Sequence, residues 1–177
     1  MKKKTLALVL ALTLLVAGVV GGTLAWLTDR TAEVKNTFTV GDINIGLTET
    51  TTDYKMVPGN TIAKDPTVTV KANSEACWLF VKVTKSENLD TFITYAIAEG
   101  WTALPGVDGV YYREVPASAA DQTFSVLADN AVTVKNTVTK EMLTAKDFAN
   151  PTLTFKAYAV QKDNVASASD AWAKVNP

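Results

Sequence analysis

The sequence predicts an all-β protein, a jelly-roll-like two-sheet β-sandwich with short helices near the C-terminus. Short segments rich in Thr and Val alternate between apolar and polar residues, as half-buried strands do. Turn residues separate these segments at the close spacing that is typical of sandwiches and jelly rolls. No linker divides the later part of the chain. We therefore expect a signal peptide at residues 1–25 and a single β-sandwich domain at residues 26–177.

The N-terminus has the three parts of a secretory signal peptide. Lysines at residues 2–4 give a positive start, residues 5–20 are an uncharged apolar run, and Gly21-Gly22 breaks this run. Small side chains then stand before a cut between Ala25 and Trp26. An uncleaved membrane anchor is the alternative, although the run is short of the ~20 residues that span a bilayer comfortably. A secreted protein that meets a membrane only through its leader is therefore expected.

The segment after the predicted cut contains a strand pattern that changes face at Gly41-Asp42. Apolar residues occupy even positions within residues 34–40 and odd positions within residues 43–47. Because successive side chains of a strand point to opposite faces, one extra residue turns the whole pattern over. A bulge or sharp bend at Gly41-Asp42 explains this change. Residues 26–40 therefore form a segment that is separable from the strand after it.

The most hydrophobic strand after the leader is predicted at residues 76–84. One face carries small and aliphatic side chains and the other carries two aromatic rings: Cys77, Leu79, Val81 and Val83 on the first, Trp78 and Phe80 on the second. Aromatic rings on the second face indicate that it is covered too, so this is the predicted central strand. As the single cysteine, Cys77 excludes an intrachain disulfide and is predicted to be a buried small hydrophobe.

Alternation, turn residues and capping residues predict the other elements. In chain order they are a strand at residues 43–48, a type II turn at Pro58-Gly59, strands at residues 67–71 and 92–98, hairpins over residues 101–115 and 122–136, a short helix capped by Thr139, a strand at residues 152–160 and a helix at residues 166–175 that docks through Trp172.

The sequence contains no recognisable catalytic, cofactor or metal site. It has no histidine, which excludes a Ser-His-Asp triad, a Cys-His pair and a histidine-ligated zinc site. Turn chemistry accounts for the acidic loop residues, while calcium binding by them stays open; these residues are Asp53, Asp65, Asp108, Asp121 and Asp129. We therefore expect no enzyme activity, no cofactor and no metal.

Charge and aromatic residues limit the classes of partner. The chain has 17 Lys+Arg and 18 Asp+Glu, with no basic stripe for nucleic acid. A monomeric adhesin or carbohydrate-binding β-sandwich is the alternative function, and its groove would need exposed aromatic side chains. The candidates are Trp78, Trp101, Tyr111, Tyr112 and Trp172. Core and sheet packing is the more common use of such residues.

Residues 21–29, followed by residues 36–43, resemble the TasA/camelysin (CalY) family of exported Gram-positive proteins, which a SipW-type signal peptidase processes. The matching features are a glycine-rich leader end, a small residue at the cut, an aromatic start and the strand Asn36-Thr37-Phe38-Thr39-Val40-Gly41-Asp42-Ile43. The resemblance continues more weakly through Pro58-Gly59-Asn60 and Lys64-Asp65-Pro66 to the strand at residues 76–83.

The resemblance implies a jelly-roll subunit of extracellular biofilm or surface fibres. Such subunits assemble by donor-strand exchange, in which the N-terminal segment of one copy completes a sheet of the next. The implied anchors are Trp26, Leu27, Val34, Phe38 and Val40. The implied partners are copies of the protein itself or another matrix protein, and the signal peptidase during export. Pairing of residues 34–40 within their own subunit is the alternative. A camelysin-like protease is disfavoured because the sequence has no histidine.

Overall fold

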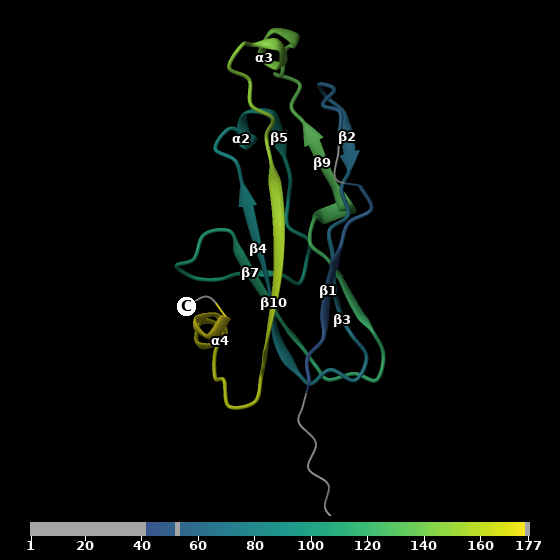
Figure 1. Ribbon diagram of the computed structural model, residues 1–177, viewed down its shortest axis with the longest axis vertical. Helices are drawn as coiled ribbons and strands as arrows, with labels where there is room; N and C mark the ends of the chain where they lie inside the picture. The colour runs from purple at the N-terminus through teal and green to yellow at the C-terminus, as the bar shows by residue number, and fades with distance from the viewer. Residues whose placement is uncertain (1–41, 52–53, 176–177) are drawn as a thin grey trace, which may run out of the picture. The chain divides into compact units, whose positions relative to one another are not determined.

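Three antiparallel sheets contain the strands of the computed structural model, which describes residues 42–51 and 54–175 (Figure 1). The first sheet has the order β1 (Ile45–Thr48), β3 (Thr67–Val70) and β8 (Gln122–Ser125). The second has the order β10 (Leu153–Gln161), β4 (Cys77–Lys85), β7 (Val110–Val115) and β6 (Thr102–Ala103). The third has the order β2 (Thr61–Ala63), β9 (Ala131–Val134) and β5 (Ile93–Thr94). The prediction of an all-β sandwich is confirmed.

Helical segments are short in the described part of the chain. They are α2 (Leu89–Phe92), a 3-10 helix at Ala128–Asn130, α3 (Lys140–Thr144) and α4 (Ala168–Val175). Thr139 caps α3 as predicted, since its hydroxyl accepts a hydrogen bond from the Met142 N–H at 3.4 Å. Ser167 does the same for α4, where it accepts from the Asp170 N–H at 3.1 Å.

The main core lies between the first and second sheets. β4 is the central strand of the second sheet, because it pairs with β10 on one side and with β7 on the other. Its odd-numbered residues, which include Cys77 and Leu79, meet Val68 and Val70 of β3, and all four are almost completely buried. The predicted division of β4 into two faces is therefore confirmed.

A second core covers the opposite face of β4. Trp78 and Phe80 point into it, and α4 closes it with Trp172, whose side chain is only 5% exposed. The ring centroids of Phe80 and Trp172 are 5.3 Å apart, and those of Tyr158 and Trp172 are 5.1 Å apart. Trp172 is thus the docking residue of the C-terminal helix, as predicted.

Of three predicted elements in this region, one is wrong, one is confirmed in part and one is confirmed. Residues 122–136 do not form a hairpin, because β8 pairs with β3 whereas β9 pairs with β2 and β5. The left-handed residues Asp129 (φ 53°) and Asn130 (φ 48°) lead the chain from the first sheet into the third. The predicted strand at residues 92–98 is confirmed in part: Phe92 belongs to α2, Ile93–Thr94 form β5, and an isolated antiparallel bridge joins Ile97 to Leu127. The hairpin of β6 and β7 is confirmed.

Candidate functional site: a groove between unpaired strand edges

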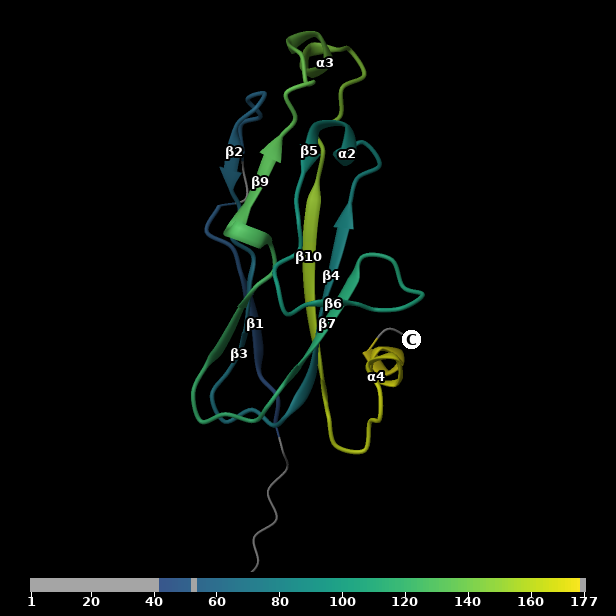
Figure 2. The same ribbon diagram turned by 180° about the vertical axis from the view of Figure 1, so that it is seen from behind.

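β1 and β10 lie side by side without pairing, as both views of the ribbon show (Figures 1 and 2). Each is the outer strand of its own sheet. β10 is also one of the two longest strands described, with nine residues. An outer strand leaves one row of backbone N–H and C=O groups without partners in its sheet. This side of the sandwich is therefore an open backbone edge.

The register identifies which backbone groups face this edge. The Lys162 N–H donates to the Ala76 carbonyl at 2.8 Å, and the Ser86 N–H donates to the Thr152 carbonyl at 2.9 Å. Hydrogen-bonded pairs alternate along an antiparallel ladder, so the even-numbered residues of β10 bond to β4. The odd-numbered residues then direct their backbone groups away from the sheet; they are Leu153, Phe155, Ala157, Ala159 and Gln161.

The same reasoning applies to β1. The Lys71 N–H donates to the Asn44 carbonyl at 2.8 Å, so the even-numbered residues of β1 bond to β3. Ile45 and Leu47 therefore direct their backbone groups away from β3. The two strands present unpaired backbone groups on the same side of the sandwich.

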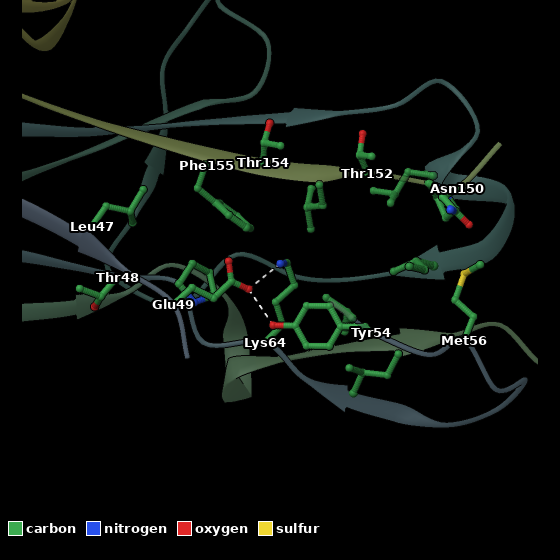
Figure 3. Close-up of a pocket in the computed structure, with 17 residues that line it drawn as sticks. Leu47, Thr48, Glu49, Tyr54, Met56, Lys64, Asn150, Thr152, Thr154 and Phe155 are labelled. Carbon is green, nitrogen blue, oxygen red and sulfur yellow. Dashed lines mark hydrogen bonds and ion pairs between the residues drawn. The ribbon is translucent and has the colours of Figure 1, made fainter. Parts of the chain in front are cut away.

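A groove of about 630 Å³ lies beside β1, β2 and β10 (Figure 3). Much of its lining is apolar and includes Leu47, Met56, Ile62, Leu153 and Phe155. Leu47 is 37% exposed and is one of two large hydrophobic residues in the described chain that are exposed to this degree. Leu89 and Val132 also line the groove and are buried. The arrangement suits a ligand that carries apolar side chains and an unpaired backbone.

A buried ion pair lies within this lining, which also contains neutral polar residues such as Asn150 and Thr152. The Lys64 Nζ lies 2.5 Å from the Glu49 Oε1, and the two side chains are only 10% and 17% exposed. The Tyr54 hydroxyl donates to the same oxygen at 2.9 Å. Burial, together with this hydrogen bond to the carboxylate, raises the pKa of Tyr54 well above its ordinary value. The Lys64 Nζ also lies 4.9 Å from the centroid of the Tyr54 ring and 5.4 Å from that of Phe155.

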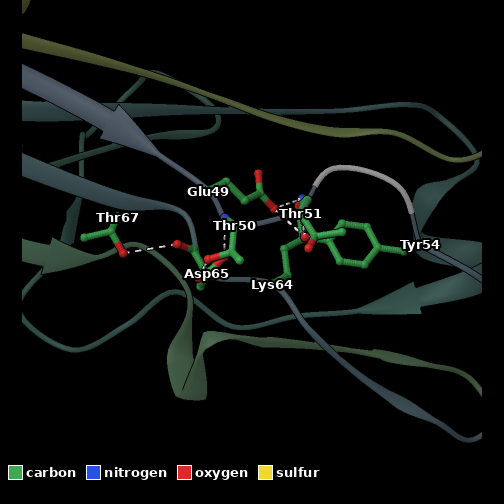
Figure 4. Close-up of polar contacts among 7 residues, drawn as sticks. All are labelled: Glu49, Thr50, Thr51, Tyr54, Lys64, Asp65 and Thr67. Atoms are coloured by element: carbon green, nitrogen blue, oxygen red, sulfur yellow. Dashed lines mark hydrogen bonds and ion pairs between the residues drawn. The ribbon is translucent and has the colours of Figure 1, made fainter.

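Asp65 holds the segment that carries Glu49 (Figure 4). Its carboxylate accepts from the Thr50 N–H at 2.9 Å and from the Thr50 hydroxyl at 2.5 Å. The hydroxyl bond and then the backbone bond lower the pKa of Asp65. The Asp65 carbonyl accepts from the Thr67 hydroxyl at 3.1 Å. The chain after β1 is thereby tied to the connection between β2 and β3, which places Glu49 beside Lys64.

The site residues predicted from the sequence lie outside the described residues. They are Ala25 and Trp26 at the cut and Trp26, Leu27, Val34, Phe38 and Val40 as donor anchors. The described residues instead contain the groove beside β1, β2 and β10, and the sequence pattern did not predict its members. The strand predicted at residues 152–160 is a partial signal, because its apolar residues Leu153 and Phe155 line the groove.

The candidate aromatic groove is not formed. Trp78 and Trp172 are buried in the second core. Tyr111 and Tyr112, being adjacent on β7, pack against opposite cores. Trp101 packs against the main core and its indole N–H donates to the Ser125 carbonyl at 2.8 Å. These rings are used for packing.

No family model, curated protein or solved structure matches the chain. Within residues 42–51 and 54–175, no group of three or more Cys, Asp or Glu side chains is arranged to hold a metal ion. None of the helices in this same part of the chain has the length and apolar character to cross a membrane.

Proposed function

We propose that this protein is a secreted structural subunit of extracellular biofilm or surface fibres. Its groove accepts residues 26–40 of a neighbouring copy after the leader has been removed. The observation that carries this proposal is the apolar groove beside two unpaired strand edges, β1 and β10. The resemblance of residues 21–29 and 36–43 to the TasA/camelysin family supports the same proposal.

The chemistry of the groove matches that of the segment. An added strand would pair with the outward backbone groups of β10, and this bonding does not depend on sequence. Selectivity would come from alternate side chains, and Val34, Phe38 and Val40 alternate in the proposed donor. Each such side chain contributes about 1.5–3 kcal/mol when it is fully buried. The affinity would therefore come mainly from the apolar anchors and from the ladder of backbone bonds.

The length of the open edge supports assembly. Proteins that stay monomeric protect edge strands by keeping them short, charged, bulged or covered. β10 has nine residues, of which Leu153, Thr154 and Phe155 line the groove. A donor that leaves one copy and enters the next makes a head-to-tail contact, which yields a filament when the contact does not close. A companion matrix protein with a similar N-terminal strand fits the same groove.

N-terminal sequencing of the secreted protein, combined with sedimentation and electron microscopy, tests this proposal. We expect the secreted chain to begin at Trp26 and to form fibres. Monomers that persist after removal of the leader, under conditions in which related fibres form, would contradict it. That outcome is also what pairing of residues 34–40 within their own subunit predicts.

The described residues weigh against the two other functions. A carbohydrate-binding sandwich needs exposed aromatic rings, whereas Trp78 and Trp172 are buried and the other three candidate rings are only partly exposed. A protease of the zinc type needs metal ligands, and the whole sequence has no histidine.

A further inference from the structure

One polar residue interrupts the apolar face of the proposed donor segment. Even positions within residues 34–40 are occupied by Val34, Asn36, Phe38 and Val40. In an extended strand these four side chains lie on the same face. The groove likewise contains one buried ion pair, Glu49 and Lys64, within a largely apolar lining. Asn36 is therefore the polar position on this donor face, and Glu49 and Lys64 are the two charged residues of the groove lining.

We propose that Asn36 of the incoming strand binds Glu49 and Lys64 and thereby fixes the register of the added strand. This inference rests on the proposed function, because it needs residues 26–40 of a second copy in the groove. It adds that the groove recognises Asn36, and that the ion pair of Glu49 and Lys64 makes this contact.

The hydrogen-bonding groups of the Asn36 side chain complement those of Glu49 and Lys64. Lys64 and Tyr54 both bond to the Oε1 of Glu49, which leaves the Oε2 without a partner among the described residues. An ammonium group has three donors, and Glu49 is the one acceptor that the described chain offers to Lys64. A carboxamide supplies both an acceptor and donors. The Asn36 carbonyl can therefore accept from Lys64 while its NH₂ group donates to the Glu49 carboxylate.

The same contact excludes other registers. A shift by one residue would turn Val34, Phe38 and Val40 away from the groove. A shift by two residues keeps the apolar face inward but places Val34 or Phe38 over the ion pair. Covering buried charges with an apolar group removes their remaining access to water without offering a hydrogen bond. A single buried Asn specifies register in coiled coils for a comparable reason.

A mutant cycle tests the energetic coupling. The variants are Asn36→Val, Lys64→Met and the double variant, and the readout is the concentration of protein left unpolymerised at equilibrium. We expect Asn36→Val to raise this concentration roughly tenfold in the wild-type background and much less in the Lys64→Met background, because contacting residues are not additive. Thr37→Val is the matched control on the opposite face of the donor and should have little effect. Thermal unfolding of each variant monitors the fold.

Isotope-mixed fibres test the contact itself. One copy carries ¹⁵N and the other carries ¹³C, so that solid-state NMR contacts between the two labels arise only between copies. We expect the Asn36 side-chain nitrogen to contact the Glu49 carboxyl carbon. If fibres form and residues 34–40 contact the groove, but Val34 or Phe38 lies beside Glu49, the register inference alone is overturned. If no contact between copies reaches the groove, the proposed function fails as well.

Discussion

Replacing Ala157 with proline should weaken fibre assembly while leaving the subunit folded. Ala157 lies in the middle of β10, and its N–H points away from β4 in the observed register. Proline removes this donor and places a ring on the open edge of β10, two residues beyond Phe155 of the groove lining. The fold should tolerate the change, since proline is accepted on edge strands where the N–H faces outward.

The expected magnitude follows from the interactions that are lost. One backbone hydrogen bond contributes about 0.5–1.5 kcal/mol net, and the steric effect of the ring raises the total to roughly 1–3 kcal/mol. Because every ~1.4 kcal/mol is a factor of ten, the concentration of unpolymerised protein should rise between about 5-fold and 140-fold. Sedimentation measures this concentration, and chemical denaturation should show that the free energy of unfolding falls by about 1 kcal/mol or less.

Thr123→Pro is the matched control on a different edge. Thr123 lies on β8, the outer strand at the far side of the first sheet, and its N–H points away from β3. This variant should assemble like the wild type. Equal assembly of the Ala157→Pro and Thr123→Pro variants would refute the assignment of the β10 edge as the acceptor.

Three further predictions concern the fold that supports the groove. Trp172→Ala should lower the free energy of unfolding by about 3–5 kcal/mol in denaturant titrations, because this 5%-exposed ring closes the second core; a loss below ~1 kcal/mol would show that α4 does not stabilise the domain. Burial raises the pKa of the Cys77 thiol to about 11, so a thiol reagent at pH 8 should label the protein only after unfolding. The pKa of Asp65 is lowered below its ordinary 3.8 by the hydroxyl and backbone N–H of Thr50. The stability that Asp65 adds relative to Asp65→Asn should therefore be complete above that ordinary pKa and should disappear as the pH falls through the lowered one; a difference that does not change with pH would contradict this.

The best-predicted elements are those whose sequence pattern carries tertiary information. The strand β4 was predicted as central because both of its faces are apolar, and both faces are indeed buried. Trp172 was predicted to dock the C-terminal helix because it is the large apolar residue of that helix. Thr139 was predicted as a cap because hydroxyl side chains satisfy the first N–H groups of a helix. Local rules were sufficient at these positions.

The wrong hairpin at residues 122–136 shows where local rules fail. Asp129 and Asn130 do adopt the left-handed conformation expected of turn residues. Their turn, however, transfers the chain to another sheet, and the partner of β8 is β3, which lies far back in the sequence. A local pattern identifies a turn but does not determine which strands it joins.

The groove could not be predicted from the sequence because it too depends on segments that are distant in the chain. Its residues come from the segments around β1, β2 and β10, which meet only in the folded chain. Lys64 is a charged residue that would ordinarily be placed at the surface. It is buried because Glu49 pairs with it and the rings of Tyr54 and Phe155 surround its ammonium group.

The position of β10 near the C-terminus means that the groove is completed late in synthesis, after the proposed donor segment. A ribosome makes the N-terminus first, so the proposed donor at residues 26–40 is complete long before the strand that borders its receiving groove. β10 spans Leu153–Gln161 of a 177-residue chain, so it is synthesised long after β4. Only when β10 has paired with β4 does it form its side of the groove. A growing chain therefore contains the proposed donor segment before it contains a complete groove. If residues 26–40 are the donor strand, only a finished subunit could accept the next one, and incomplete chains could not join one another.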